Sequence, residues 1–271
     1  MTRSLRFFKT VASGNDFILL DQKDQVLPSS PTAFARDWCD RRRGIGADGM
    51  LLVLPSRKAD ARMRIFNSDG SEAEMCGNGL RCVAWYLHIR NHGKREFRLE
   101  TRGGLMQAKI IGHERVRIQW TSPKQLRLGL ELTHRGKHYL IHSVNSSVPH
   151  AVLFVRRLQA AEPEVLGPVI RHHRFFKPGG TNVNWVQIHS PHKISVRTFE
   201  RGVEAETPAC GTGAIASVLI GTALKRLKPP VQVRTQGGNI LTVGFRQEPR
   251  PWEGLYLEGP AKILFEGKPR G

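Results

Sequence analysis

The stretch RIFNSDGSEAEMCGNGLRC, residues 64–82, has a counterpart later in the chain, RTFERGVEAETPACGTGAIAS, residues 197–217. Both stretches begin with R-x-F, continue through polar and acidic residues, and reach Cys-Gly-x-Gly just before an apolar run. A pattern of this length that occurs twice in one chain indicates an internal repeat. The two copies therefore decide how the rest of the sequence is interpreted.

The separation between the copies is nearly constant along the chain. Cys76 and Cys210 lie 134 positions apart, and the same offset relates TRGG at 101–104 to TQGG at 235–238. It also relates SGNDFILL, from Ser13, to SVPHAVLF, from Ser147. We infer two related units of about 135 residues, which is close to the usual size of one hydrophobic core.

The junction between the units is placed in the polar stretch around residues 121–137. We expect an N-terminal half at residues 1–125 and a C-terminal half at residues 126–259. The last strand-like segment, YLEGPAKILFE, spans residues 256–266, and whether the end of the chain, at about 260–271, returns to the first half is left open.

The composition is that of an ordinary globular protein, with 39% hydrophobic and 24% charged residues. The apolar runs are far shorter than the roughly 20 residues of a membrane-spanning helix, and MTRSLRFFKT at the N-terminus lacks the apolar region of a signal peptide. Four cysteines, at 39, 76, 82 and 210, show neither C-x-x-C nor a paired framework, which favours reduced thiols over disulfides or a zinc site. We therefore expect a cytoplasmic protein with no membrane partner.

The formal net charge of +19 raises the question of nucleic-acid binding. The basic residues are spread from Arg3 to Arg270, and only RRR at 41–43 forms a run. No zinc-finger, helix-turn-helix or aromatic RNA-binding pattern accompanies them. We expect a generally basic surface and no specific nucleic-acid partner.

The hydrophobic pattern predicts strands and two unusually apolar helices. Alternation of apolar and polar residues predicts strands at 116–120, 184–189, 193–199, 231–235 and 241–245, and 50–54 is typical of a more buried strand. The Gly-Gly pairs at 103–104 and 237–238 favour tight hairpins. Helical periodicity occurs at 31–42, 80–90 and 214–227. The last two helices are apolar on nearly all sides, so each should be the buried helix of its unit, surrounded by strands.

The chemistry follows from the position of the two cysteines at the starts of those helices. The first N–H groups of a helix are unpaired and its dipole is positive there, which favours a bound carboxylate and a thiolate. Two such ends, related by an approximate twofold, would hold one carboxylate and place Cys76 and Cys210 on opposite faces of its α-carbon. One thiolate would take the α-proton while the other thiol supplies a proton to the far face.

The predicted reaction is therefore racemisation or epimerisation, and it requires no nicotinamide, pyridoxal or metal cofactor. An alternative is a disulfide between Cys76 and Cys210, which would be an inactive oxidised form. Cys39 and Cys82 are expected to be inert buried thiols.

Five motifs resemble the diaminopimelate epimerase family, in matching order and over nearly the whole chain: KTVASGNDFILLD, RRRGIGADGMLLV, RIFNSDGSEAEMCGNGLRC, GGTNVNWVQ and ERGVEAETPACGTGA. The resemblance implies an α/β (α+β) fold of two pseudo-symmetric domains, each a mainly antiparallel, barrel-like sheet wrapped around a central helix. It implies an active site in the cleft between the domains. The implied activity is cofactor-independent interconversion of LL- and meso-diaminopimelate, in lysine and cell-wall precursor synthesis.

The resemblance also assigns roles residue by residue. Cys76 and Cys210 match the two acid/base thiols. The donors to the carboxylate at the reacting end match Gly77, Asn78, Gly211 and Thr212; the residues that hold the substrate, including its distal end, match Asn15, Asn67, Asn182 and Arg201; polar partners near the reacting centre match Glu200 and His150. Two positions depart from the family pattern, Val148 in place of an asparagine and Gly49 in place of a glutamine.

Two other functions are weighed against this one. Another two-cysteine racemase or epimerase, acting on proline, hydroxyproline or histidine, would share the architecture, but Arg201 and the asparagines at 67 and 182 favour a substrate with a second amino-acid end. An inactive, basic polyanion-binding protein of the same fold is the alternative from a different class. The expected partner is a small-molecule substrate, diaminopimelate, and a homodimer is left open.

Overall fold

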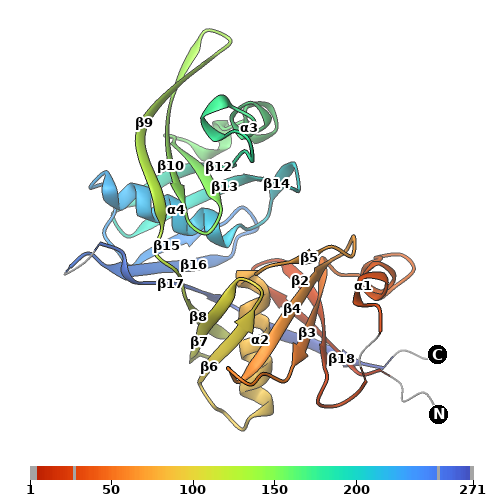
Figure 1. Cartoon of the computed structure of the whole chain (residues 1–271). Helices are drawn as coiled ribbons and strands as arrows, with labels where there is room; N and C mark the ends of the chain where they lie inside the picture. Colours follow the sequence, from red (N-terminus) through yellow and green to blue (C-terminus); the bar gives the residue numbers. More distant parts are fainter. Residues whose placement is uncertain (1–4, 27–28, 249–250, 269–271) are drawn as a thin grey trace. The chain divides into compact units, whose positions relative to one another are not determined.

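The structure is a computed structural model that describes residues 5–26, 29–248 and 251–268 (Figure 1). The chain divides into two compact units: unit 1 comprises Met1–Gln119 and Gly259–Gly271, and unit 2 comprises Trp120–Glu258. The division after Gln119 lies six positions before the 125/126 junction expected from the sequence. Most of the polar stretch in which that junction was expected forms a regular strand, β9 (Lys124–His134).

Unit 1 contains two helices and most of the N-terminal strands. Its elements are β1 (Phe7–Ala12), β2 (Asn15–Asp21), α1 (Pro31–Cys39), β3 (Gly49–Leu54), β4 (Ala61–Asn67), β5 (Glu72–Ala73), α2 (Gly77–Arg90), β6 (Glu96–Thr101), β7 (Gly104–Gly112), β8 (Arg115–Gln119) and, from the end of the chain, β18 (Lys262–Gly267). Strand β18 pairs antiparallel with β1. The C-terminal strand therefore belongs to the sheet of unit 1.

Unit 2 repeats this plan with an added helix. Its elements are β9 (Lys124–His134), β10 (Lys137–Asn145), β11 (Pro149–Phe154), η1 (Leu158–Ala160), α3 (Pro163–Arg171), η2 (Arg174–Phe176), β12 (Asn182–Ser190), β13 (Lys193–Glu200), β14 (Ala205–Thr207), α4 (Gly211–Ala223), β15 (Val231–Arg234), β16 (Ile240–Arg246) and β17 (Glu253–Pro260), whose last two residues fall in unit 1. The single final strand expected from YLEGPAKILFE is in fact two, β17 and β18. They separate at Pro260 and Ala261, because proline has no N–H to continue a strand ladder.

The pairing of strands confirms the repeat. The parallel pair β2/β3 in unit 1 corresponds to the parallel pair β11/β12 in unit 2. In the same way, the antiparallel β3/β4 corresponds to β12/β13, and the parallel β4/β6 corresponds to β13/β15. The predicted fold class, a mixed and mainly antiparallel architecture of two related units, is confirmed, although the strands form no closed barrel within the described ranges.

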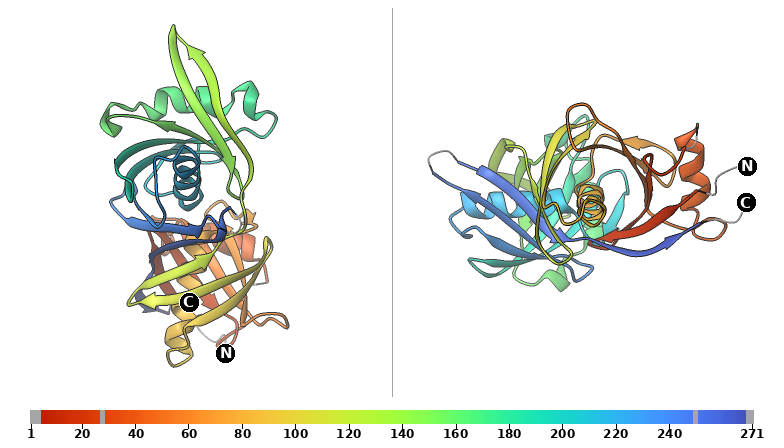
Figure 2. Two further views of the ribbon diagram at one scale, coloured as in Figure 1. Left: turned by 90° about the vertical axis from the view of Figure 1, so that its left-hand side faces the viewer. Right: turned by 90° about the horizontal axis from the view of Figure 1, so that it is seen from below.

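Each unit is built around one buried helix, as the apolar sequences predicted. Every residue of α2 from Asn78 to Leu87 is buried, and so is every residue of α4 from Gly213 to Gly221. Figure 2 shows α4 nearly end-on among its strands in the left view, and α2 among its strands in the right view. Helix α2 contacts β1, β7 and β8, and α4 contacts β10, β11 and β12. The strands thus fix where each helix begins.

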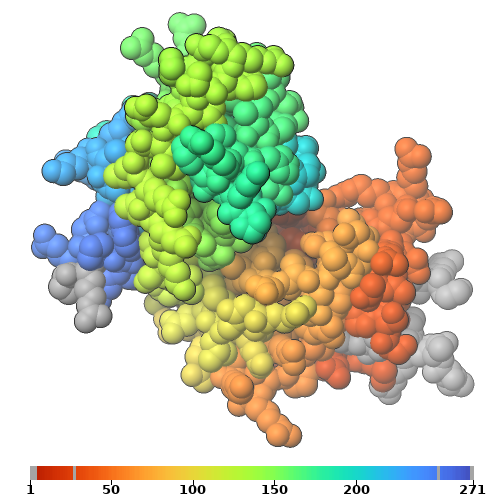
Figure 3. All heavy atoms as spheres, turned by 45° about the horizontal axis from the view of Figure 1, so that its top comes forward, coloured from red at the N-terminus to blue at the C-terminus, as the bar shows by residue number. Residues whose placement is uncertain are grey.

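Some element boundaries differ from the predictions. Helix α4 ends at Ala223 rather than at residue 227, because Lys225 adopts a left-handed φ of 57° and Leu227 folds back over Gly221. Helix α3 was not predicted. Strand β9 and its partner β10, whose segment is coloured yellow-green in Figure 3, carry the exposed side chains of Leu126, Leu128 and Leu140. No described helix is long and apolar enough to cross a membrane.

Candidate active site

The repeated R-x-F motif holds the segment that leads to each cysteine. In unit 1, Arg64 on β4 donates two hydrogen bonds to Glu72 on β5, from Nε to Oε1 at 2.8 Å and from Nη2 to Oε2 at 3.0 Å. In unit 2, Arg197 on β13 binds Glu206 on β14 in the same two-pronged way, at 2.6 Å and 2.6 Å. Bidentate arginine–carboxylate pairs fix orientation as well as distance. Each arginine therefore fastens the short return strand that precedes its cysteine.

The repeated T-x-G-G motif makes a second attachment to the same segments. The N–H of Gly103 donates to the carbonyl of Glu74 at 3.0 Å, and the N–H of Gly237 donates to the carbonyl of Pro208 at 2.7 Å. Each acceptor lies two residues before a cysteine. The predicted Gly-Gly hairpins are present, with left-handed φ values of 115° at Gly104 and 81° at Gly238. The hairpins thus position the approach to each helix.

Each cysteine is the N-cap of its central helix. Cys76 and Cys210 have extended backbone angles, φ −143° and φ −126°. Their Sγ atoms accept from the N–H groups of Gly79 and Gly213, both at 3.4 Å. Oxygen side chains are the usual N-caps, so sulfur at this position in both units indicates a role beyond capping. Both thiols lie where the helix dipole favours negative charge.

The second glycine of Cys-Gly-x-Gly is required by close packing. A Cβ at Gly213 would lie 2.3 Å from Oδ1 of Asn184, and a Cβ at Gly79 would lie 2.9 Å from Cδ2 of Leu51. Strands therefore approach the first turn of each helix more closely than any side chain allows. The motif combines a thiol at the cap with a backbone that nearby strands can contact.

In unit 1 the predicted binding residues Asn15 and Asn78 are joined to each other. Nδ2 of Asn78 donates to Oδ1 of Asn15 at 2.6 Å, and Nδ2 of Asn15 donates to Oδ2 of Asp48 at 2.8 Å. Asn67 ends β4 next to Gly49 and donates from Nδ2 to Oγ of Ser71 at 2.9 Å. A Cβ at Gly49 would lie 2.6 Å from the carbonyl oxygen of Phe66. The backbone at this position therefore leaves no room for the glutamine of the family pattern.

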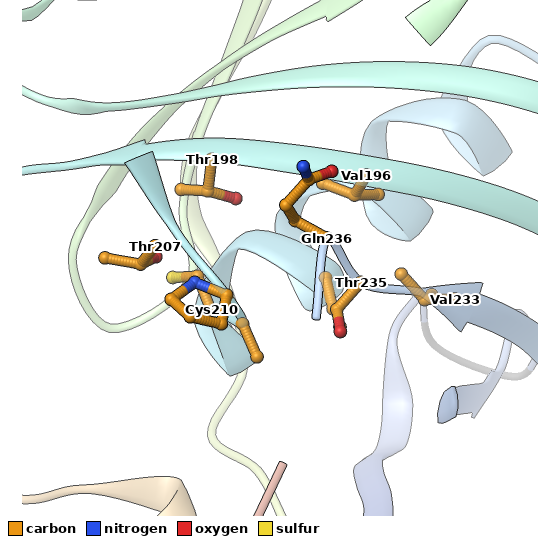
Figure 4. A pocket seen from close by; sticks show the side chains of 10 residues that line it. Val196, Thr198, Thr207, Cys210, Val233, Thr235 and Gln236 are labelled. Atoms are coloured by element: carbon orange, nitrogen blue, oxygen red, sulfur yellow. The ribbon is translucent and has the colours of Figure 1, made fainter. Parts of the chain in front are cut away.

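In unit 2 the residues predicted to surround Cys210 form two groups. Thr212 Oγ1 lies 3.4 Å from Cys210 Sγ, and Thr207 donates to Oε2 of Glu200 at 2.8 Å. A recess at the start of α4 is lined by Cys210 and by residues of β13, β14 and β15 (Figure 4). Figure 4 places the hydroxyl side chains of Thr198 and Thr207 beside this recess. The thiol therefore faces a polar setting within its own unit.

The side-chain amide of Asn182 forms hydrogen bonds to the backbone through both its oxygen and its nitrogen. Its Oδ1 accepts from the N–H of Arg201 at 2.8 Å, and its Nδ2 donates to the carbonyl of Pro149 at 3.1 Å. The side chain is only 4% exposed. Nη1 of Arg201 donates to the carbonyl of Gly179 at 3.3 Å, and the side chain is half-buried. Asn182 thus sets the position of Arg201, which the sequence could not show.

His150 is a buried, neutral histidine, and one of its ring nitrogens has no hydrogen-bond partner among the described residues. Nδ2 of Asn184 lies 3.0 Å from Nδ1 and can only donate, so the proton of the neutral ring is on Nε2. Burial, followed by the charge of Arg201, lowers the pKa of His150 to about 3. Its Nε2 is buried with no hydrogen-bond partner among the described residues. The ring therefore has one N–H still to donate.

Sequence reasoning missed Asn184, which organises this region. Besides His150, it donates to the carbonyl of Ala151 at 2.9 Å and accepts from Thr198 Oγ1 at 2.9 Å. It is fully buried. An asparagine in the middle of an otherwise apolar strand, NVNWV, was the available signal, because a buried amide must be satisfied by hydrogen bonds.

The thiols differ in their electrostatic surroundings. Burial, and then the charge of Glu200, raise the pKa of the Cys210 thiol to about 12, against smaller opposite effects of hydrogen bonds from Thr212 and Gly213. Burial also raises the pKa of Glu200. Burial likewise raises the pKa of Cys39 to about 11 and that of Cys82 to about 12, as expected for inert thiols. No cluster of three or more potential metal ligands occurs among the described residues.

Solved structures share this fold. A phenazine biosynthesis protein of the PhzF family from Bacillus anthracis matches with a TM-score of 0.76 and 16% identity, over 99% of this chain and all of that one. A hydroxyproline epimerase from Agrobacterium vitis matches with a TM-score of 0.70 and 18% identity, over 98% and 92% of the two chains. The fold places the chain in the structural class that contains these proteins.

The family follows from sequence. The model of the diaminopimelate epimerase family matches residues 7–125 and 142–264. The diaminopimelate epimerase of Carboxydothermus hydrogenoformans is 40% identical to this chain, over 97% of it and 99% of its own length. This chain belongs to the diaminopimelate epimerase family.

Proposed function

We propose that this protein interconverts LL- and meso-diaminopimelate by proton transfer at one α-carbon, with Cys76 and Cys210 as the acid and base. The observation that carries the proposal is the repeated cap: each cysteine is the N-cap of a buried helix, and its sulfur lies at the unpaired N–H groups of that helix. Family membership supports the choice of substrate.

The reaction divides into two proton transfers. A thiolate takes the α-proton, the C–H electron pair spreads into the adjacent carboxylate, and the thiol of the other cysteine protonates the carbon on the opposite face. The two sulfurs exchange protonation states in each turnover, and no other reagent is consumed. The activation barrier arises mainly from the negative charge that develops on the carboxylate oxygens when the α-proton is removed.

Backbone donors at the helix starts would stabilise that charge. We assign this role to the N–H groups of Gly77 and Asn78 on α2, and of Gly211 and Thr212 on α4. Donors of this kind contribute about 2.7–4 kcal/mol each to transition-state stabilisation. Because the helices are buried along their length, the donors are fixed before the substrate arrives.

The remaining predicted residues are assigned to substrate binding. Arg201 would bind the distal carboxylate, with its position set by Asn182, and Asn15 and Asn67 would contact the substrate from unit 1. His150 would donate from Nε2, and Glu200 would lie beside the reacting centre. These residues favour a substrate with a second amino-acid end, such as diaminopimelate, over proline or hydroxyproline.

The direction of the first transfer follows from Cys210. With its pKa raised to about 12, this thiol is protonated at neutral pH. We infer that Cys210 begins a turnover as the acid and Cys76 as the base.

The location and partners are proposed on chemical grounds. Catalysis by two thiols requires that they stay reduced, which favours the cytoplasm. The substrate connects the enzyme to lysine and cell-wall precursor synthesis. Diaminopimelate is the only partner the mechanism requires, and light scattering of the purified protein would show whether it is a homodimer.

A substrate panel tests the proposal. Reduced protein without added cofactor is incubated separately with LL-diaminopimelate, L-proline, trans-4-hydroxy-L-proline and L-histidine, and the stereoisomers are separated by chiral chromatography. We expect conversion of LL-diaminopimelate to the meso form and none of the others. Turnover of a cyclic amino acid or of histidine instead would favour the alternative racemases, and no turnover of any would favour an inactive binding protein.

A further inference from the structure

Arg81 is a fully buried arginine in the second turn of α2, five residues after Cys76. Its hydrogen-bond acceptors are neutral groups. Nη2 donates to Ser13 Oγ at 2.9 Å and to Oδ1 of Asn78, and Nε donates to the carbonyl of Pro260 at 3.3 Å. Its Nη1 is buried with no hydrogen-bond partner within the part of the chain that the structure describes.

Such a residue is costly for the fold. A buried charge without a counter-charge is penalised by several kcal/mol even after relaxation, and burial lowers the pKa of Arg81 to about 10. The position that corresponds to it in unit 2, at the same offset of 134, is Ile215, which is also fully buried. The fold can therefore fill this place with an aliphatic side chain, and packing alone does not explain the arginine.

The hydrogen bonds of Arg81 decide how two predicted binding residues are oriented. Because Oδ1 of Asn78 accepts from the guanidinium, its Nδ2 must face Asn15 and donate to Oδ1 there. Asn15 is left with Nδ2, which donates to Asp48. An amide on its own has two orientations of similar shape. Arg81 selects one orientation for both side chains.

The charges around the guanidinium point to Cys76. The titratable groups that act on Arg81 are Cys82 of α2, Cys76 at the N-cap of that helix, and Arg115 of β8. Cys82 remains a neutral thiol, since burial raises its pKa to about 12. Among the charged residues of β1, β2 and the loop before β3, Lys9 pairs with Asp16, and Arg41 pairs with both Asp16 and Asp48. The buried Asp21 accepts a hydrogen bond from Tyr86. Of the three groups, Cys76 is the one that can supply a negative charge.

We propose that Arg81 is a positioning residue that keeps Cys76 in its thiolate form and fixes the Asn78–Asn15 pair beside it. The role of Arg81 in catalysis rests on the proposed function, whereas its effect on the charge state of Cys76 can be tested independently of that function. The two units then differ in a useful way: the thiol of unit 1 interacts electrostatically with the buried cation of Arg81, and the thiol of unit 2 with the carboxyl of Glu200. One half of a symmetric repeat has become the resting base and the other the resting acid.

Alkylation of the wild-type protein is the first test and needs no substrate. Iodoacetamide is applied from pH 6 to pH 9, and the modification of each cysteine is followed by mass spectrometry of its peptide. We expect Cys76 to react at least about ten-fold faster than Cys210 at pH 7, because the thiolate is the reactive form. Equal rates, or faster reaction at Cys210, would overturn the proposal.

Variants separate charge from geometry. Arg81→Met removes the charge and Arg81→Lys retains it; Arg90→Met, at the other end of α2 in an ion pair with Asp24, is the control. In Arg81→Met we expect alkylation of Cys76 at pH 7 to fall about ten-fold, as expected for loss of one nearby opposite charge, with Cys210 unchanged. Arg81→Lys should restore most of the alkylation rate but still raise KM, because lysine cannot hold Asn78 as the guanidinium does.

Each outcome of the variants has a definite meaning. Unchanged alkylation of Cys76 in a folded Arg81→Met protein rejects the proposal. If Arg81→Met does not fold, the same measurement on Arg81→Gln, which keeps a hydrogen-bond donor, decides the matter. Wild-type alkylation as expected together with an inactive substrate panel would reject the proposed function and leave the role of Arg81 standing.

Discussion

Replacing each second glycine of Cys-Gly-x-Gly by alanine offers a quantitative test of how the two helix starts are packed. The added methyl of Gly213→Ala would lie 2.3 Å from Oδ1 of Asn184 and 3.2 Å from Oγ1 of Thr198. Overpacking costs about 1–3 kcal/mol, and disturbing buried hydrogen bonds about 1–3 kcal/mol. Alanine recovers roughly 0.5–1 kcal/mol of helix propensity. We expect a net destabilisation of about 2–4 kcal/mol around α4.

The matched variant Gly79→Ala should behave differently. Its closest contact is Cδ2 of Leu51 at 2.9 Å, the end of a flexible side chain that can rotate away. A strain of about 1 kcal/mol is nearly cancelled by the same gain in helix propensity. We expect the stability around α2 to change little.

Hydrogen exchange of the two helices measures both effects. With about 1.4 kcal/mol for each factor of ten, the protected amides of α4 should exchange roughly 30- to 700-fold faster in Gly213→Ala, and those of α2 should be nearly unaffected in Gly79→Ala. Equal effects of the two variants, or a larger one at Gly79, would refute the assignment of the close contact to Asn184.

Three further outcomes are expected. Alanine at either N-cap cysteine should abolish inversion in the chiral assay, while Cys39→Ala should keep nearly full activity; comparable activity in all three would reject the two-thiol mechanism. Because the pKa of His150 falls to about 3 on folding, the unfolded chain binds a proton below pH 6.5 that the folded chain does not, so stability should fall by about 1.4 kcal/mol per pH unit between pH 6.5 and pH 4. Urea titrations should show this slope reduced by about one proton in His150→Phe, and an unchanged slope would contradict it. Arg197→Met, which releases Glu206, should cost about 1–2 kcal/mol and lower kcat more than it raises KM, whereas a pure KM effect would mean that the pair does not position Cys210.

The sequence predicted those parts of the fold in which local pattern and tertiary packing agree. Helices α2 and α4 are apolar on nearly all sides and follow a sharp glycine turn, so their existence and approximate position were visible, although their exact ends were not. The repeat itself was visible because the residues that hold each cysteine segment, the arginine of R-x-F and the glycines of T-x-G-G, make the same contacts in both units.

The missed features depend on contacts that lie far apart in sequence. Helix α3 is short and contains Pro168, and its burial comes from packing Gly167 against the ring of Phe199 on β13. Strand β9 is exposed along most of its length, so its alternating leucines were hidden among polar residues. Asn182 and Asn184 occur in one motif, but only the structure separates their contacts: Asn182 holds the backbone of Arg201, and Asn184 holds His150.

The central claim, that two different thiols serve opposite faces of one carbon, is tested most directly by where solvent hydrogen appears. LL-diaminopimelate is incubated with the protein in D2O, and the reaction is stopped after a small fraction has converted. Each stereoisomer is then isolated and its α-deuterium measured by mass spectrometry. Two thiols predict deuterium at one α-carbon of the meso product and almost none in the recovered LL substrate. Equal labelling of substrate and product would mean that a single group removes and returns the proton, and would contradict the account.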